Sequence, residues 1–152
     1  TVTGVQTCAL PISTLGSDVA DAGTLASILW DLCERVSQRA KAAGLGGRTI
    51  QLKLKTHDFR IITRRQSLAQ PSQLAGRLFE AGRRLLEEEA TGRRYRLVGI
   101  GISDLVPADL CDSGDLLAGS AARRDEAERA MDKVRSRFGT GAIRKGRSLR
   151  ED

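Results

Sequence analysis

The residues of this chain that are best suited to chemistry are cations in a predicted β-hairpin. Six Lys and Arg residues lie between residues 48 and 70, against a single acid, Asp58. Lys53 and Lys55 are two residues apart, and side chains alternate along a strand, so both point to the same face. Such a face is suited to phosphates, and the net charge of +6 favours a polyanionic partner. The alternative is an ordinary solvated strand face, since Lys and Arg are common on exposed strands.

The other reactive side chains do not form a catalytic or metal-binding pattern. His57 is the only histidine and lies in a predicted turn, and Cys33 has no partner set for nucleophilic catalysis. Four aspartates lie in a strand end and a linker, where acids are usually solvated: Asp104, Asp109, Asp112 and Asp115. We therefore predict no catalytic residue, no metal site and no cofactor within this chain.

Cysteine usage and hydropathy indicate where the protein resides. The three cysteines form no motif, which favours a reducing compartment without a disulfide framework. The longest apolar runs are far too short to span a bilayer. We expect a soluble, cytoplasmic protein with no membrane partner.

The cations must be positioned by a helix and a hairpin. Apolar residues recur at steps of three and four over residues 24–43, which predicts an amphipathic helix that ends at Gly44. Ile50, Leu52 and Leu54 then alternate with Gln51, Lys53 and Lys55, and His57-Asp58 marks the turn of a hairpin. The register of the second strand stays open, because Phe59, Ile61 and Thr63 share one face and Arg60, Ile62 and Arg64 the other.

A second helix and a third strand follow. The spacing of apolar residues predicts a helix over residues 72–90. Over residues 95–105 it predicts a strand with Val98, Ile100 and Ile102 on one face. A linker extends to about residue 120. A last helix is predicted over 121–138, with five apolar residues on one side: Ala127, Ala130, Met131, Val134 and Phe138. Two amphipathic helices and three strands predict an α+β fold, in which both helices cover one face of an antiparallel sheet and leave the other face open.

The stretch TIQLKLKTHDFRIITRRQSL, followed by a helix and YRLVGIGISDL, resembles the little-finger domain of Y-family translesion DNA polymerases of the DNA polymerase IV (DinB) type. The resemblance runs from about residue 16 to 106. It implies a βαββαβ domain that lies across the DNA major groove beside the primer-template junction and mainly contacts phosphates. The positions that it assigns to DNA binding are Lys53, Lys55, Arg60, Thr63, Arg64, Arg65, Gly99, Gly101 and Ser103.

The first residues fit neither the resemblance nor the rest of the composition. TVTGVQTCALPIS, residues 1–13, carries no charged side chain, and from Val2 to Ile12 it back-translates into a string that resembles a sequencing-library adapter. A natural N-terminal strand and turn is the alternative. We expect residues 1–13 to be non-native, the first strand of the family's sheet to be missing, and residues 14–22 to keep its end. The resulting organisation is a little-finger domain over 14–106, a linker over 107–120 and a C-terminal helix with a basic tail over 121–152.

The resemblance also implies what a longer protein would do. The parent would be a DNA-directed DNA polymerase that uses magnesium, whereas this fragment lacks the palm carboxylates and is predicted to be inactive. The implied partners are a primer-template duplex and the sliding clamp, although residues 107–111 lack the Gln and the aromatic residue of a clamp-binding peptide. Two other functions stay open: a protein-interaction module that binds an acidic partner, and a small RNA-binding protein, against which the shortage of stacking aromatics argues.

Overall fold

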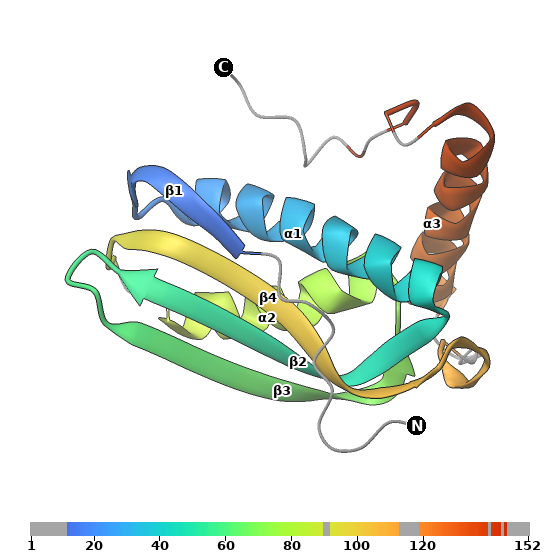
Figure 1. Cartoon of the computed structure of the whole chain (residues 1–152), viewed down its shortest axis with the longest axis horizontal. Coiled ribbons are helices and arrows are strands. Elements are labelled where there is room, and N and C mark those ends of the chain that lie inside the picture. The colour runs from blue at the N-terminus through green and yellow to red at the C-terminus, as the bar shows by residue number, and fades with distance from the viewer. Residues whose placement is uncertain (1–11, 90–91, 113–118, 140, 144, 146–152) are drawn as a thin grey trace.

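The chain forms one antiparallel sheet with helices on one side (Figure 1). The computed structural model describes residues 12–89, 92–112, 119–139, 141–143 and 145. The strands follow the order β1-β4-β2-β3 across the sheet. The elements are, in chain order, β1 (Ile12–Val19), α1 (Ala22–Ala43), β2 (Leu45–Thr56), β3 (Ile61–Ser72), α2 (Ala75–Glu89), β4 (Tyr95–Pro107), the short 3₁₀ helix η1 (Ala108–Leu110) and α3 (Gly119–Phe138).

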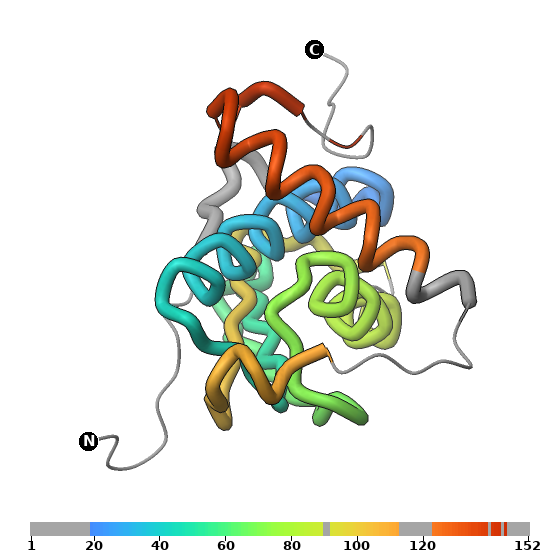
Figure 2. The backbone as a smooth tube through the Cα atoms, turned by 90° about the vertical axis from the view of Figure 1, so that its right-hand side faces the viewer, coloured from blue at the N-terminus to red at the C-terminus, as the bar shows by residue number. Residues whose placement is uncertain are grey.

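Helices α1 and α2 cover the same face of the sheet, as Figure 2 shows from the side. The first is bounded by local signals: Asp21 accepts a hydrogen bond from the backbone N–H of Thr24 at 2.7 Å, and Gly44 ends the helix with a left-handed φ of 68°. The second begins at Ala75 rather than at residue 72, because β3 continues to Ser72, which pairs with Gly47. The predicted α+β class is confirmed.

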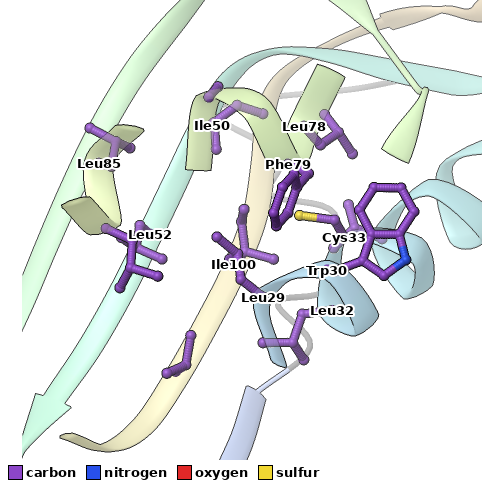
Figure 3. Close-up of a cluster of buried hydrophobic side chains, with 14 of the residues drawn as sticks. Leu29, Trp30, Leu32, Cys33, Ile50, Leu52, Leu78, Phe79, Leu85 and Ile100 are labelled. Atoms are coloured by element: carbon purple, nitrogen blue, oxygen red, sulfur yellow. The ribbon is translucent and has the colours of Figure 1, made fainter. Parts of the chain in front are cut away.

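An aliphatic core fills the space between the helices and the sheet (Figure 3). Leu29 and Leu32 of α1 and Leu78 and Leu85 of α2 pack on Ile100 and its neighbours in β2 and β4. Trp30 and Cys33, which the helical pattern places at the margin of the apolar stripe, are fully buried. The reason is α2: the Trp30 ring meets the Phe79 ring edge-to-face at 5.3 Å between centroids.

The sheet has four strands where the sequence led us to expect three. The additional strand is β1, in which Ile12 pairs with Gly99 and Ser13 with Val98 of β4. Both residues belong to the segment that resembles an adapter. Strand pairing joins backbone groups, so it does not require a particular set of side chains. The rest of that segment, residues 1–11, lies outside the described residues.

The predicted linker after β4 is in part folded onto the domain. The Ala108 N–H donates to the Gly44 carbonyl at 2.9 Å, and the Asp112 carboxylate accepts from the Ser72 hydroxyl at 2.6 Å. Asp112 is therefore not a solvated acid as expected. Cys111 packs over Gly46, where a Cβ would lie 2.2 Å from its sulfur, so that only glycine fits at this position.

Helix α3 lies across α1 and α2 on the side away from the sheet (Figure 2), and it packs there with charged side chains. The five apolar residues that the sequence places on one side of this helix contribute little burial: Ala127 and Ala130 are exposed, Phe138 is 73% exposed, and Met131 and Val134 are half-buried. Asp125 and Glu128 are buried instead. Asp125 pairs with Arg77 of α2 at 2.7 Å, and Glu128 pairs with Lys41 of α1 at 3.0 Å. Within the described residues, no helix is long and apolar enough to cross a membrane.

Candidate nucleic-acid interface

The pairing of β2 with β3 decides which side chains share the open face of the sheet. Lys53 is paired with Thr63, and Gln51 with Arg65. Directly paired residues of an antiparallel ladder point to the same side. The alternate residues of β2, including Leu52, are buried beneath the helices. Four predicted site residues therefore gather on the open face, and we call them the cationic face: Lys53, Lys55, Thr63 and Arg65.

Three further predicted positions lie on β4 beside this face. Gly99 is paired with Lys53, Gly101 with Gln51 and Ser103 with Thr49. The two glycines add no side chain above the sheet next to Lys53, which is what a close approach of a DNA backbone would require. All three positions are nevertheless buried, and Ser103 is only 2% exposed, so none of them is accessible to a phosphate in this conformation.

The remaining two predicted residues do not join the cationic face. Arg64 is paired with Leu52, so it points to the helix side, where its Nε donates to Glu89 at the end of α2 at 2.7 Å. Arg60 lies in the hairpin turn, where its side chain is 84% exposed and forms an ion pair with Asp58 at 3.3 Å. A hydrogen bond from the Thr56 hydroxyl lowers the pKa of the Asp58 carboxyl, so this acid is charged at neutral pH.

The hairpin turn brings together residues that sequence reasoning missed. The Phe59 ring lies beside two cations, with the Lys55 Nζ 5.1 Å and the Arg96 guanidinium carbon 4.4 Å from its centroid. Arg96 reaches the turn because the pairing of β2 with β4 shifts there: Lys55 pairs with Leu97 and Thr56 with Tyr95, which leaves Arg96 as the extra residue of a bulge. No regular spacing in the sequence marks a bulge, so Arg96 could not be selected from the alternation pattern.

The described residues offer no metal site to accompany this surface. Within them, no three His, Cys, Asp or Glu side chains lie close enough together to hold a metal ion. The cationic face is basic, with half-buried lysines on β2 and exposed residues on β3. Its groups can bind and orient an anion, whereas they include no paired acid and base for proton transfer.

Comparisons with known proteins agree with this fold. The model of the impB/mucB/samB family C-terminal domain matches residues 12–116. Among solved structures, the chain is similar to the little-finger domain of PolIV in its complex with the beta-clamp processivity factor, with a TM-score of 0.52 and 24% identity over 61% of this chain and 84% of that one. It is also similar to Dbh DNA polymerase in an insertion ternary complex, with a TM-score of 0.56 and 13% identity over 64% of this chain and 28% of that one. At these identities, the two structures show the fold alone.

The curated sequence relatives have higher sequence identity to this chain than these solved structures have. DNA polymerase IV of Brucella melitensis is 48% identical over 134 residues, which are 88% of this chain and 30% of the relative. DNA polymerase IV 1 of Mesorhizobium japonicum is 44% identical over 134 residues, 88% of this chain and 31% of the relative. The chain thus spans about a third of the length of the curated relatives that it matches.

The fold is that of a little-finger domain, and the curated sequence relatives named above are DNA polymerases IV. The chain belongs to the impB/mucB/samB family and carries its C-terminal domain, in the form found in DNA polymerase IV of the DinB type.

Proposed function

We propose that the cationic face binds the phosphates of a primer-template duplex, and that the chain is the DNA-gripping domain of an error-prone translesion polymerase. The observation that carries this proposal is the register of the β2–β3 hairpin, which places Lys53, Lys55, Thr63 and Arg65 on one side of the sheet. Lysine and arginine bind phosphate through charge-assisted hydrogen bonds, and a threonine hydroxyl adds a neutral donor.

Phosphate contacts suit a polymerase that copies damaged templates. They fix the position of a duplex without reading its bases, so a lesion in a base leaves them intact. Binding of this kind depends steeply on salt, because each neutralised phosphate releases condensed counterions. We expect duplex affinity with little sequence preference and a strong dependence on salt.

The test is duplex binding by the double variant Lys53→Glu/Lys55→Glu, measured by fluorescence anisotropy across a salt series. We expect this variant to lose detectable binding, because two attractive contacts become repulsive. The matched control is Arg35→Glu/Arg39→Glu, which makes the same change in net charge on the exposed side of α1. Equal losses in both variants would show that net charge, and not this face, attracts DNA.

The second candidate function is an interaction module whose basic face binds an acidic protein. A pull-down with the chain as bait tests it. Recovery of one acidic protein after nuclease treatment, together with no duplex binding at low salt, would favour this function. An RNA-binding function would instead show as a preference for RNA over a DNA duplex of the same length.

We further propose that the parent protein is a DNA-directed DNA polymerase that uses magnesium and binds the sliding clamp. The support is the similarity to full-length polymerases and, for the clamp, the solved complex of a PolIV little finger with that factor. Residues 107–111 are folded against Gly44, with Leu110 exposed. The other short segment considered for clamp binding, residues 115–117, also lacks the Gln and the aromatic residue and lies outside the described part of the chain. Calorimetry with a bacterial clamp tests this contact, and no heat of binding would exclude it for this fragment.

A further inference from the structure

Two large apolar side chains are exposed at the hairpin end of the cationic face. Phe59 is 62% exposed and Ile61 is 59% exposed, and they are two of the four large hydrophobic residues that are exposed in the described part of the chain. Both lie against Lys55: Ile61 is its partner in the β2–β3 ladder, and Phe59 contacts its ammonium group. A duplex backbone that presents only phosphates does not explain an apolar surface at this place.

The turn holds Phe59 in a conformation that phenylalanine seldom adopts. Its φ is 65°, in the left-handed region, where a bulky side chain costs energy. The turn is fixed by hydrogen bonds, from the Phe59 N–H to the Thr56 carbonyl at 3.0 Å and from the Arg60 N–H to the Thr56 hydroxyl at 3.1 Å. Strain of this kind often accompanies a residue that is positioned for function.

The turn places the Phe59 ring between two cationic side chains. Lys55 and Arg96 come from different strands and meet at the same ring, so two phosphate-binding groups flank one exposed aromatic surface. A positively charged surface with an exposed ring is the combination that binds single-stranded nucleic acid, since the cations hold the phosphates and the ring stacks on a base.

We propose that Phe59, Ile61, Lys55 and Arg96 form a site for an unpaired nucleotide that extends from the duplex. The base packs on the ring of Phe59 and on Ile61, while Lys55 and Arg96 bind its flanking phosphates. This inference rests on the proposed function, because it places the unpaired nucleotide next to the duplex on the cationic face. It assigns Phe59, Ile61 and Arg96 to DNA binding in addition to the predicted residues.

The test uses the whole chain and three probes: a blunt duplex, the same duplex with a single-stranded thymidine extension, and that duplex with an abasic extension of equal length. The abasic extension keeps every phosphate and removes the bases. We expect the thymidine extension to bind about tenfold more tightly than the abasic one. Phe59→Gly is expected to remove this difference and to leave blunt-duplex affinity unchanged, because glycine accepts the left-handed φ without strain.

Two further variants separate the contributions of charge and ring. Arg96→Gln is expected to reduce the slope of log affinity against log salt by about 0.7 with the extended probe, the value for one single-strand phosphate contact. Phe138→Ala, which truncates an exposed phenylalanine on α3, is expected to keep the wild-type preference. Equal affinity of the wild-type chain for thymidine and abasic extensions would overturn the inference and leave duplex binding intact. Failure to bind the blunt duplex at low salt would overturn the proposed function itself, and the inference with it.

Discussion

At the scale of single residues, Phe79 and Phe59 show how position decides what an aromatic ring contributes. Phe79 is buried against Trp30, whereas Phe59 stands at the surface in a strained turn. We expect Phe79→Ala to lower the free energy of unfolding by about 3–5 kcal/mol, since it leaves a cavity in the core. Phe59→Gly should stay within about 1 kcal/mol of the wild type, because relief of the left-handed φ offsets the lost cation–π contacts. Urea unfolding measures both, and a larger loss at Phe59 would mean that the turn depends on its ring.

Residue types alone could predict part of the cationic face. The clean alternation of Ile50, Leu52 and Leu54 places Lys53 and Lys55 on the open side without reference to any other strand. Arg64 could not be placed in this way, since apolar residues occur on both faces of its strand, with Ile61 on one and Ile62 on the other. The turn sets that register, and it directs Arg64 toward Glu89 of α2.

At the scale of elements, the docking of α3 depends on one carboxylate. Glu128 accepts hydrogen bonds from the N–H groups of Ala75 and Gly76 at 2.7 and 3.0 Å, which lie at the N-terminus of α2, and it pairs with Lys41 of α1. Burial raises the pKa of Glu128, but the Lys41 charge and these backbone hydrogen bonds together outweigh burial and lower it below its ordinary value. Helix α3 thus ties α1 to α2 through a charged group.

We expect Glu128→Gln to lower the free energy of unfolding by about 1–3 kcal/mol at neutral pH, because charge-assisted hydrogen bonds become neutral ones. Since the folded-state pKa lies below the unfolded value, this stabilisation is present above the unfolded pKa and is lost as the pH falls through the folded pKa. The difference between wild type and variant should therefore be largest at neutral pH and shrink as the pH falls below the ordinary glutamate pKa, as measured by urea unfolding across an acid pH series. Glu126→Gln, on the exposed side of α3, is the matched control, and a pH-independent difference would contradict the assignment.

The sequence could predict that α3 is a helix but not how it packs. Its apolar residues fall at helical spacing, yet Phe138 is exposed and Asp125 and Glu128 are buried. The partners of these acids, Arg77 and Lys41, are far away in the sequence, and only the fold brings them together. Hydrophobic periodicity carries no information on such ion pairs.

At the scale of the whole molecule, the boundary of the domain can be tested by truncation. We propose that residues 1–13 are non-native. Because Ile12 and Ser13 nevertheless pair with β4, a chain that begins at Ile12 keeps the whole of β1 and should melt at the same temperature as the full chain. A chain that begins at Ala20 loses β1 and its pairing with β4, which should cost about 2–4 kcal/mol and lower Tm by about 10 °C. Circular dichroism melts measure both chains. Equal melting temperatures would show that β1 does not stabilise the sheet.

The order of the elements was enough to predict the α+β architecture, because two amphipathic helices that share one core must pack their apolar sides on the same face of a sheet. The number of strands did not follow from it. The pairing of Ile12 and Ser13 with β4 is made by backbone atoms, and side-chain patterns over so few residues do not specify it.

Strand β3 lies at the edge of the sheet, so the charges of its arginines also affect whether the chain associates with itself. A strand of 12 residues with one unpaired side is a template on which another copy of the chain could add a strand. Arg64 and Arg65 place charge on both of its faces, which opposes such self-association. Removing the charge of Arg65, which lies on the cationic face, would therefore be expected to lower solubility together with duplex affinity, whereas removing the charge of Arg64 would lower solubility alone.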